Sequence, residues 1–257
     1  MSTHAKSFPI CLIAFWCWAL INIQTAQAMS ILHSEAHVLN FQINSTGSLA
    51  MNPWLNIAAA GAFDDPSGWS QVYDDDPGAT GQAFASAATA YASAQSVTSS
   101  NLLTIDVSGD LNNSTNNFFA MNAYSYGEFY TTFQVSGDDL IEATFSLDWA
   151  ALLSGQSSLD QSFYADYAIQ LLVSDGATYW SREAFNTLSG SGAFQSITNS
   201  GTLSLTLTLQ PDVLYSLDIL AHPNDIIEQI PEPPVIALIF GAGFLTQRFG
   251  FFRRKSV

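Results

Sequence analysis

Two aspartate-rich turns are the residues best suited to bind a ligand, and they nearly repeat each other. The first is FDDPSG at residues 63–68 and the second is YDDDPG at residues 73–78. Neighbouring carboxylates on turns that contain Gly and Pro supply the oxygen ligands that calcium prefers. No EF-hand spacing is present, and aspartate beside Pro and Gly is also ordinary turn chemistry. The candidate calcium ligands are Asp64, Asp65, Asp74, Asp75 and Asp76.

Two histidines four positions apart form a second candidate site. On a helix, His33 and His37 would share one face and could bind a metal ion together. Glu35 stands between them, whereas the H-E-x-x-H motif of metalloproteases needs its glutamate directly after the first histidine. The alternative interpretation is an exposed, mobile segment near the N-terminus. His222 is interpreted as a solvated turn residue.

Signs of catalysis are sparse in the sequence. No G-x-S-x-G elbow appears, so a serine nucleophile has no local signature. A glycosidase needs two carboxylates at a set separation, but a chain with 22 acidic residues always offers pairs. Arg182 could clamp a carboxylated sugar, or it could pair with the neighbouring Glu183.

Aromatic residues provide candidate sugar-stacking positions. Aromatic rings can lie against the apolar face of a sugar, although packing in the core or between strands is their more common role. The candidates for stacking are Tyr124, Tyr126 and Trp180.

The charge of the central region limits its partners. Between Met29 and Ile230 there are 21 acidic residues and one basic residue, Arg182, which gives a formal charge of −20. Such a field repels nucleic acids and anionic membranes, so no nucleic-acid partner is expected. Solubility outside the cell is the alternative reason for this charge.

Apolar and polar residues alternate with period two over many short segments. In residues 203–209, for example, four leucines alternate with Ser204, Thr206 and Thr208. Period two gives a strand one apolar face and cannot give one to a helix. About nine such segments predict a mainly β fold, a single antiparallel β-sandwich of jelly-roll-like form. The predicted strands cover residues 39–43, 103–107, 118–126, 129–135, 141–149, 167–173, 177–183, 203–209 and 215–221.

An alanine- and serine-rich tract at residues 81–100 is less clear, because alanine favours helices whereas Ser and Thr tolerate strands. We expect it to be extended. Polar turns are predicted at Ser108-Gly109-Asp110, at residues 136–139 and at residues 174–176. Helices are expected to be short at most, at residues 32–37 and 149–154.

The N-terminus has the pattern of a secretory signal peptide. Lys6 precedes an apolar stretch at residues 10–21, and Ala26-Gln27-Ala28 forms an A-x-A cleavage site. An N-terminal anchor that is not cleaved is the alternative. Both cysteines lie before this site, so cleavage would leave a protein without thiols.

The C-terminus combines an apolar run with basic residues. The run from Val235 to Leu245 would span only about 16 Å as a helix, roughly half of a hydrocarbon core. Continuing it to Phe252 gives enough length. By the positive-inside rule, the basic residues would hold this end in the cytoplasm. These residues are Arg248, Arg253, Arg254 and Lys255.

The order of features at this end is specific. Pro231-Glu232-Pro233, the glycine-containing apolar run and the arginine cluster together resemble the PEP-CTERM sorting signal of exported bacterial proteins. The resemblance covers about the last 27 residues, and Pro234 and Arg248 depart from the usual pattern. It implies transient anchoring in the inner membrane, cleavage near the motif by an exosortase, which is a membrane transpeptidase-like enzyme, and a link to exopolysaccharide production.

The predicted organisation is therefore a signal peptide at residues 1–28, a β-sandwich at 29–224, a linker at 225–230 and a sorting signal with a transmembrane helix at 231–257. We expect an exported, non-catalytic protein of the cell surface or exopolysaccharide matrix. Its processing partners would be signal peptidase and an exosortase-like transpeptidase. The alternatives are a carbohydrate-binding module, with or without calcium, that takes extracellular polysaccharide, and a polysaccharide hydrolase or lyase. No cofactor other than calcium is expected.

Overall fold

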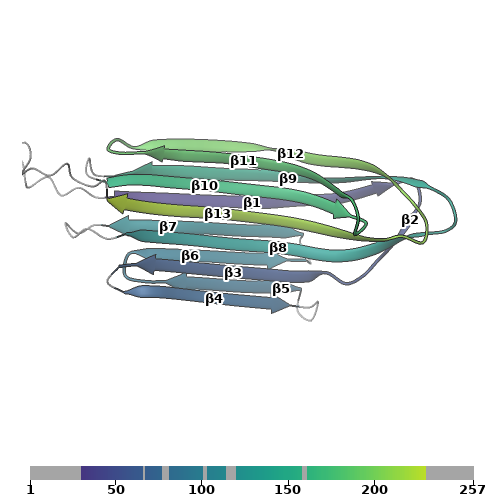
Figure 1. The fold of residues 1–257 in the computed structure, drawn as a ribbon, viewed down its shortest axis with the longest axis horizontal. Coiled ribbons are helices and arrows are strands. Elements are labelled where there is room, and N and C mark those ends of the chain that lie inside the picture. Colours follow the sequence, from purple (N-terminus) through teal and green to yellow (C-terminus); the bar gives the residue numbers. More distant parts are fainter. Residues whose placement is uncertain are drawn as a thin grey trace, which may run out of the picture.

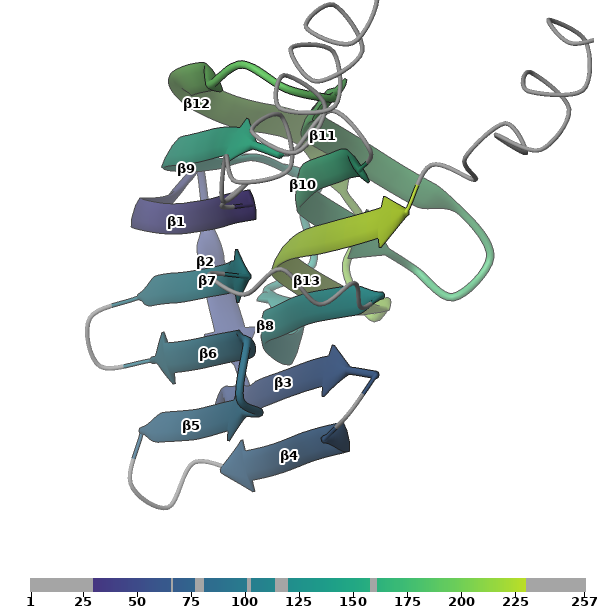
Figure 2. The ribbon, with the colours of Figure 1, turned by 90° about the vertical axis from the view of Figure 1, so that its left-hand side faces the viewer.

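The computed structural model describes residues 30–65, 67–76, 81–100, 103–113, 120–157 and 161–229. Within these ranges the chain forms thirteen strands and no helix. The strands make two antiparallel sheets that pack face to face as an elongated sandwich (Figure 1, Figure 2). The prediction of a mainly β, two-sheet antiparallel fold is confirmed.

Each sheet collects strands from distant parts of the chain. Sheet A has the order β12 (Gln195–Leu209), β9 (Ile141–Gln156), β1 (Ser30–Ser45), β7 (Thr104–Asn113), β6 (Ala92–Ser99) and β5 (Gln82–Ala88). Sheet B has the order β11 (Tyr179–Gly190), β10 (Gln161–Ser174), β13 (Leu214–Gln229), β8 (Met121–Ser136), β3 (Leu55–Asp64) and β4 (Gly68–Asp76). The short strand β2 (Ser48–Met51) pairs with β8. The outermost strands β4 and β5 lie together on one side of the sandwich, and β11 and β12 on the other (Figure 2).

A β-bulge in β1 changes which residues face the core. Before the bulge Val38 is buried, and after it Phe41 is buried, while Leu39 between them is 38% exposed. Asn40 has a φ of 51°, in the left-handed region that asparagine tolerates. The pairing register of β1 with β9 shifts at this point. Regular alternation over the strand predicted at residues 39–43 would put Leu39 and Phe41 on one face. This expectation is wrong, because a bulge inserts a residue into the alternation.

The alanine- and serine-rich tract forms β5 and β6, which confirms that it is extended. Five of its seven alanines point into the sandwich, whereas Ala88 and Ala90 are exposed. Cα atoms of β3 and β5, which belong to opposite sheets, come within 8 Å of each other. Sheets usually pack about 10 Å apart, so small inward side chains account for this close approach. The buried alanines of the tract are Ala83, Ala85, Ala87, Ala92 and Ala94.

Several local expectations are wrong because the strands are longer than their sequence signals. The helical turns expected at residues 32–37 and 149–154 lie within β1 and β9. Gly109 sits inside β7 and not in a turn. A Cβ at Gly109 would lie 2.7 Å from a carboxyl oxygen of Asp225, so close packing requires glycine there.

The linker predicted at residues 225–230 is also different in the structure, because β13 continues to Gln229. Asp225 is completely buried beside Ser34 of β1, where burial raises the pKa of its carboxyl well above the usual range. An acidic residue near the end of a predicted domain indicates a linker only if its side chain is exposed to solvent.

Both ends of the described body lie at the same end of the sandwich (Figure 1). Ser30 donates a hydrogen bond to Gln161, and Gln161 is the strand partner of Gln229. The predicted processing residues Ala26, Ala28 and Pro231 to Pro233, and the basic residues from Arg248 onward, lie outside the described residues. In the part that is described, no helix is long and apolar enough to cross a membrane.

Candidate functional site

The two aspartate clusters predicted to bind calcium lie far apart. In the β3–β4 hairpin, Asp64 pairs with Gly68 at one end and Asp76 pairs with Asn56 at the other. Eight residues of strand separate these positions, which is about 27 Å. The clusters cannot share an ion, and the described residues contain no group of three or more acidic or histidine side chains arranged to hold a metal.

The aspartate carboxylates instead accept hydrogen bonds from backbone N–H groups. Asp74 accepts from the N–H of Phe84 at 2.8 Å and Asp76 from that of Gln82 at 3.0 Å. Both donors belong to β5, an edge strand of the opposite sheet, so the carboxylates occupy edge donors that would otherwise be open to another chain.

Asp64 has the same kind of role at the other end of the hairpin. Its carboxylate accepts hydrogen bonds from the N–H groups of Ser67 at 2.7 Å and Tyr91 at 3.1 Å. Burial raises the pKa of Asp64, but hydrogen bonds outweigh this effect and hold the pKa below its usual value. Asp65 and Asp75 are exposed.

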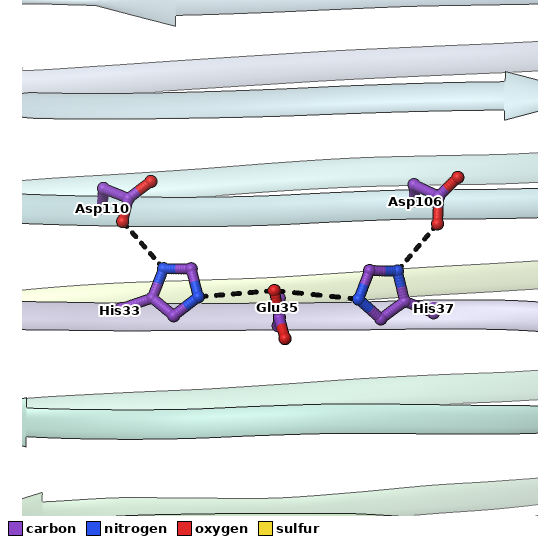
Figure 3. A network of polar contacts seen from close by, with 5 residues as sticks. All are labelled: His33, Glu35, His37, Asp106 and Asp110. Atoms are coloured by element: carbon purple, nitrogen blue, oxygen red, sulfur yellow. Dashed lines mark hydrogen bonds and ion pairs between the residues drawn. The ribbon is translucent and has the colours of Figure 1, made fainter.

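His33 and His37 belong to a row of histidine and carboxylate side chains on the outer face of sheet A (Figure 3). The register of β1 and β7 places His33 opposite Asp110 and His37 opposite Asp106. Each histidine Nδ1 lies 2.7 Å from its aspartate. The two Nε2 atoms approach the same Glu35 oxygen, at 3.4 Å and 3.8 Å. The pair is thus held in a strand and not in a mobile segment.

This row is an ionic clasp between β1 and β7. The hydrogen bond to Asp110 is the main cause that raises the pKa of His33 to about 9; burial opposes it, and the charges of Asp110, Glu35 and Asp225 add to it. His33 is therefore a cation at neutral pH. The sequence contained a signal for this arrangement, since Asp106 and Asp110 have the same four-residue spacing as the histidines, but it is informative only once β1 and β7 are known to pair.

An open hollow of about 260 Å³ lies next to the clasp, at the turn between β5 and β6 and the end of β7. Its lining is mostly polar and includes the Asp110 that holds His33. The lining residues are Thr89, Ala90, Tyr91, Ala92, Ser93, Asp110 and Asn112.

The three residues predicted to stack on sugars do not form one platform. Tyr124 and Tyr126 lie on the outer face of sheet B, both on β8. Trp180 lies on β11, three strands away, and packs against the core. The structure thus brings two of the three candidates together.

The outer face of sheet B carries further aromatic residues beside these two tyrosines. On β4, Trp69 and Tyr73 are 64% and 60% exposed. The ring of Phe63 on β3 lies 4.9 Å from that of Trp69. A Cβ at Gly61 would fall 2.1 Å from a ring atom of Tyr124, so this ring lies directly over β3. Together the rings of β4, β3 and β8 form an aromatic face, which comprises Phe63, Trp69, Tyr73, Tyr124 and Tyr126.

Two carboxyl groups, those of Glu128 and Asp218, lie close together beside the aromatic face. The hydroxyl of Tyr126 donates a hydrogen bond to Glu128, and burial together with this contact raises the pKa of the tyrosine. Burial is also the main cause that raises the pKa of Asp218 to about 7, followed by the charge of Glu128. The ring of His222 lies 6.4 Å from that of Tyr126, and burial lowers the pKa of this histidine. The interpretation of His222 as a solvated turn residue is wrong, because this residue lies within strand β13.

Arg182 does not pair with Glu183 as one sequence interpretation held. Its guanidinium donates a hydrogen bond to the carbonyl oxygen of Ser181 at 3.1 Å, and no ion pair of Arg182 occurs among the described residues. Successive side chains of a strand point to opposite faces, which separates the two charges.

Comparison of the chain with protein-family models, with curated proteins and with solved structures finds no match.

Proposed function

We propose that this chain is an exported, non-catalytic protein of the bacterial cell surface or exopolysaccharide matrix, delivered by a C-terminal sorting signal of the PEP-CTERM type. One observation carries the proposal: all thirteen described strands lie between the two predicted processing sites. The first strand begins at Ser30, after Ala28, and the last ends at Gln229, before Pro231. A fold whose strands need neither signal is compatible with removal of both.

The position of the two ends of the described body, Ser30 and Gln229, supports the same route. Ser30 and Gln229 meet at one end of the sandwich, so a body held by its tail would have that end nearest the membrane. In this proposal a signal helix precedes a jelly-roll-like sandwich and an apolar helix follows it. Signal peptidase would remove the first helix and an exosortase-like enzyme the second.

The geometry of the histidines supports a role without catalysis. A nucleophilic triad needs a histidine whose one nitrogen is held by a carboxylate and whose other nitrogen reaches a hydroxyl. His33 and His37 meet the first condition, but their Nε2 atoms face the carboxylate of Glu35. Their arrangement is that of a structural clasp.

Intact mass and location of the native protein in its own host test this proposal. Replacement of Pro231, Glu232 and Pro233 by alanine is the variant to compare. We expect the wild type to end near the motif and to leave the inner membrane, and the variant to keep Val257 and stay there. Retention of Val257 by both proteins would refute a processed sorting signal.

Carbohydrate binding is the second candidate function, and the aromatic face of sheet B favours it. Exposed rings beside amide and carboxylate groups match the alternating apolar faces and hydroxyls of sugars. The producer's own polysaccharide, tested for retention and for cleavage, separates binding from hydrolysis or elimination.

A further inference from the structure

The register of β4 places its large rings outside the sandwich. Trp69 and Tyr73 point away from the core, whereas Ser70 and Asp74 occupy the opposite face. A shift of one residue would bury the rings instead, because side chains alternate between faces. The hydrogen bonds from Phe84 and Gln82 of β5 to the carboxylates of Asp74 and Asp76 oppose that shift.

The stability of the fold alone does not explain why β4 has the register that exposes Trp69 and Tyr73. Water contact with apolar surface is unfavourable, and these two rings remain more than half exposed. The neighbouring strand β3 has small residues, Ala59 and Gly61, between the rings of β4 and those of β8. The ring of Tyr124 lies over Gly61, and the ring of Trp69 lies 4.9 Å from that of Phe63, so small residues of β3 leave room for rings above this part of the sheet.

The polar groups between the rings suit a ligand rich in hydroxyls. Gln71 lies between Trp69 and Tyr73 on the same face of β4, and Asp75 follows on that face; both are exposed. An amide can donate and accept hydrogen bonds, and a carboxylate accepts them. Trp69 and Tyr73 are about 13 Å apart along the strand, farther than one sugar ring extends. A sugar ligand that contacts both rings must therefore contain more than one sugar unit.

Charge selects among the polymers that could lie on this face. The described residues include 20 of the chain's 22 acidic residues, and Arg182 is their only lysine or arginine. This field repels uronate-containing polysaccharides, anionic membranes and a second copy of the chain. A neutral polysaccharide has no charge to repel and has apolar ring faces to stack.

From these observations we infer that the aromatic face binds a neutral polysaccharide, with Trp69 and Tyr73 stacking on sugar rings and Gln71 and Asp75 bonding to hydroxyls. The inference rests on the carbohydrate-binding candidate above and adds the site and the class of ligand. It does not depend on how the tail is processed.

The test uses protein purified from its own host and polysaccharide from the same host, separated by anion exchange into neutral and anionic fractions. Retention in gels that contain each fraction gives the dissociation constant. The variants are Trp69→Thr, Tyr73→Thr and their combination, because threonine keeps the preference for strands. Phe84→Thr is the matched control, since Phe84 is 51% exposed on the outer face of sheet A and threonine keeps the backbone N–H that bonds to Asp74.

We expect the neutral fraction to retain the wild type and the control equally. Each single variant should weaken binding about tenfold, and the double variant should abolish retention. A second measurement needs no variant: bound polysaccharide should protect the exposed Trp69 of the wild type from fluorescence quenching by acrylamide.

The inference is overturned if the neutral fraction does not retain the wild type. It is also overturned if the double variant is retained as strongly as the wild type, or if the wild type prefers the anionic fraction. A dimer in sedimentation that the double variant dissociates would assign the face to self-association instead. Protein that is processed and exported but binds no polysaccharide refutes only this inference. Protein that binds polysaccharide but keeps its tail in the membrane refutes only the sorting proposal.

Discussion

The hairpin β3–β4 and the strand pair β9–β12 bury opposite kinds of residue. In β9–β12 the inward residues include the large Phe145, Leu147 and Leu205, and the outward Thr144 and Thr206 share a hydrogen bond of 2.9 Å. In β3–β4 the inward face carries small and acidic residues, and the outward face carries large rings. The inward set is Ala58, Ala60, Ala62, Asp74 and Asp76, and the outward set is Phe63, Trp69 and Tyr73.

The difference separates what holds the sandwich together from what it presents to its surroundings. Burial of large apolar side chains stabilises β9–β12 in the usual way. In β3–β4, close approach of the sheets and carboxylate hydrogen bonds hold the hairpin while the rings stay in water. The first pair is built for stability, and the second combines stability with an available surface.

The largest effect should come from opening a cavity in the large-residue part of the core. Phe145→Ala removes a ring that is fully buried, so we expect a loss of about 3–5 kcal/mol in the free energy of unfolding. Urea denaturation measures this loss. The outward neighbour Thr144→Ala is the control and should cost no more than about 1 kcal/mol. Equal losses for the two variants would contradict the contrast between the faces of β9.

The small-residue part of the core should respond to added volume. Ala60→Leu introduces a larger side chain where Ala60 has no exposed surface, so overpacking should cost about 1–3 kcal/mol. Ala88→Leu, on the outer face of β5, is the control and should leave the denaturation midpoint unchanged. If Ala60→Leu stabilised the protein, the alanines would be lining a void and not a close contact.

A smaller effect is expected from the clasp on the outer face of β1, the neighbour of β9. The pKa of His33 is raised to about 9 from an unfolded value near 6.5. Its contribution is therefore fully present below pH 6.5 and is lost as the pH rises through about 9. Because the site is partly solvated, we expect a loss of about 1 kcal/mol.

Nuclear magnetic resonance of the His33 ring checks this expectation, with a titration midpoint near pH 9 in the wild type. Asp110→Asn removes the main hydrogen-bonding charge and should return the midpoint toward 6.5. A midpoint near 6.5 in the wild type would mean that the clasp does not exist in solution.

The smallest effect on stability should come from the aromatic face itself. Tyr73 is 60% exposed, so Tyr73→Thr should change the free energy of unfolding by less than about 0.5 kcal/mol. Denaturation under the conditions used for Phe145→Ala provides a direct comparison. A loss as large as that of Phe145→Ala would show that the ring supports the fold, and the contrast between the two strand pairs would fail.

Strands with clear apolar–polar alternation can be predicted from the sequence, but the strands with which they pair cannot. Residues 141–149 and 203–209 were expected as strands, and they lie in β9 and β12. The bulge at Asn40 was missed because an asparagine within alternating residues has no separate signal. Asp74 and Asp76 are predicted from the sequence only as candidate calcium ligands on a turn, because the N–H groups that bond to them come close only when the two sheets pack.

By itself the sequence determined the mainly β character of the body, because period-two alternation is a local property of the chain. It also contained every charge and ring described above. Only the tertiary structure decided that His33 meets Asp110, that Asp74 and Asp76 point inward, and that Trp69 and Tyr73 therefore point outward. These outcomes depend on strand register and on contacts between residues far apart in the chain, and a shift of one residue in register reverses which face each side chain occupies.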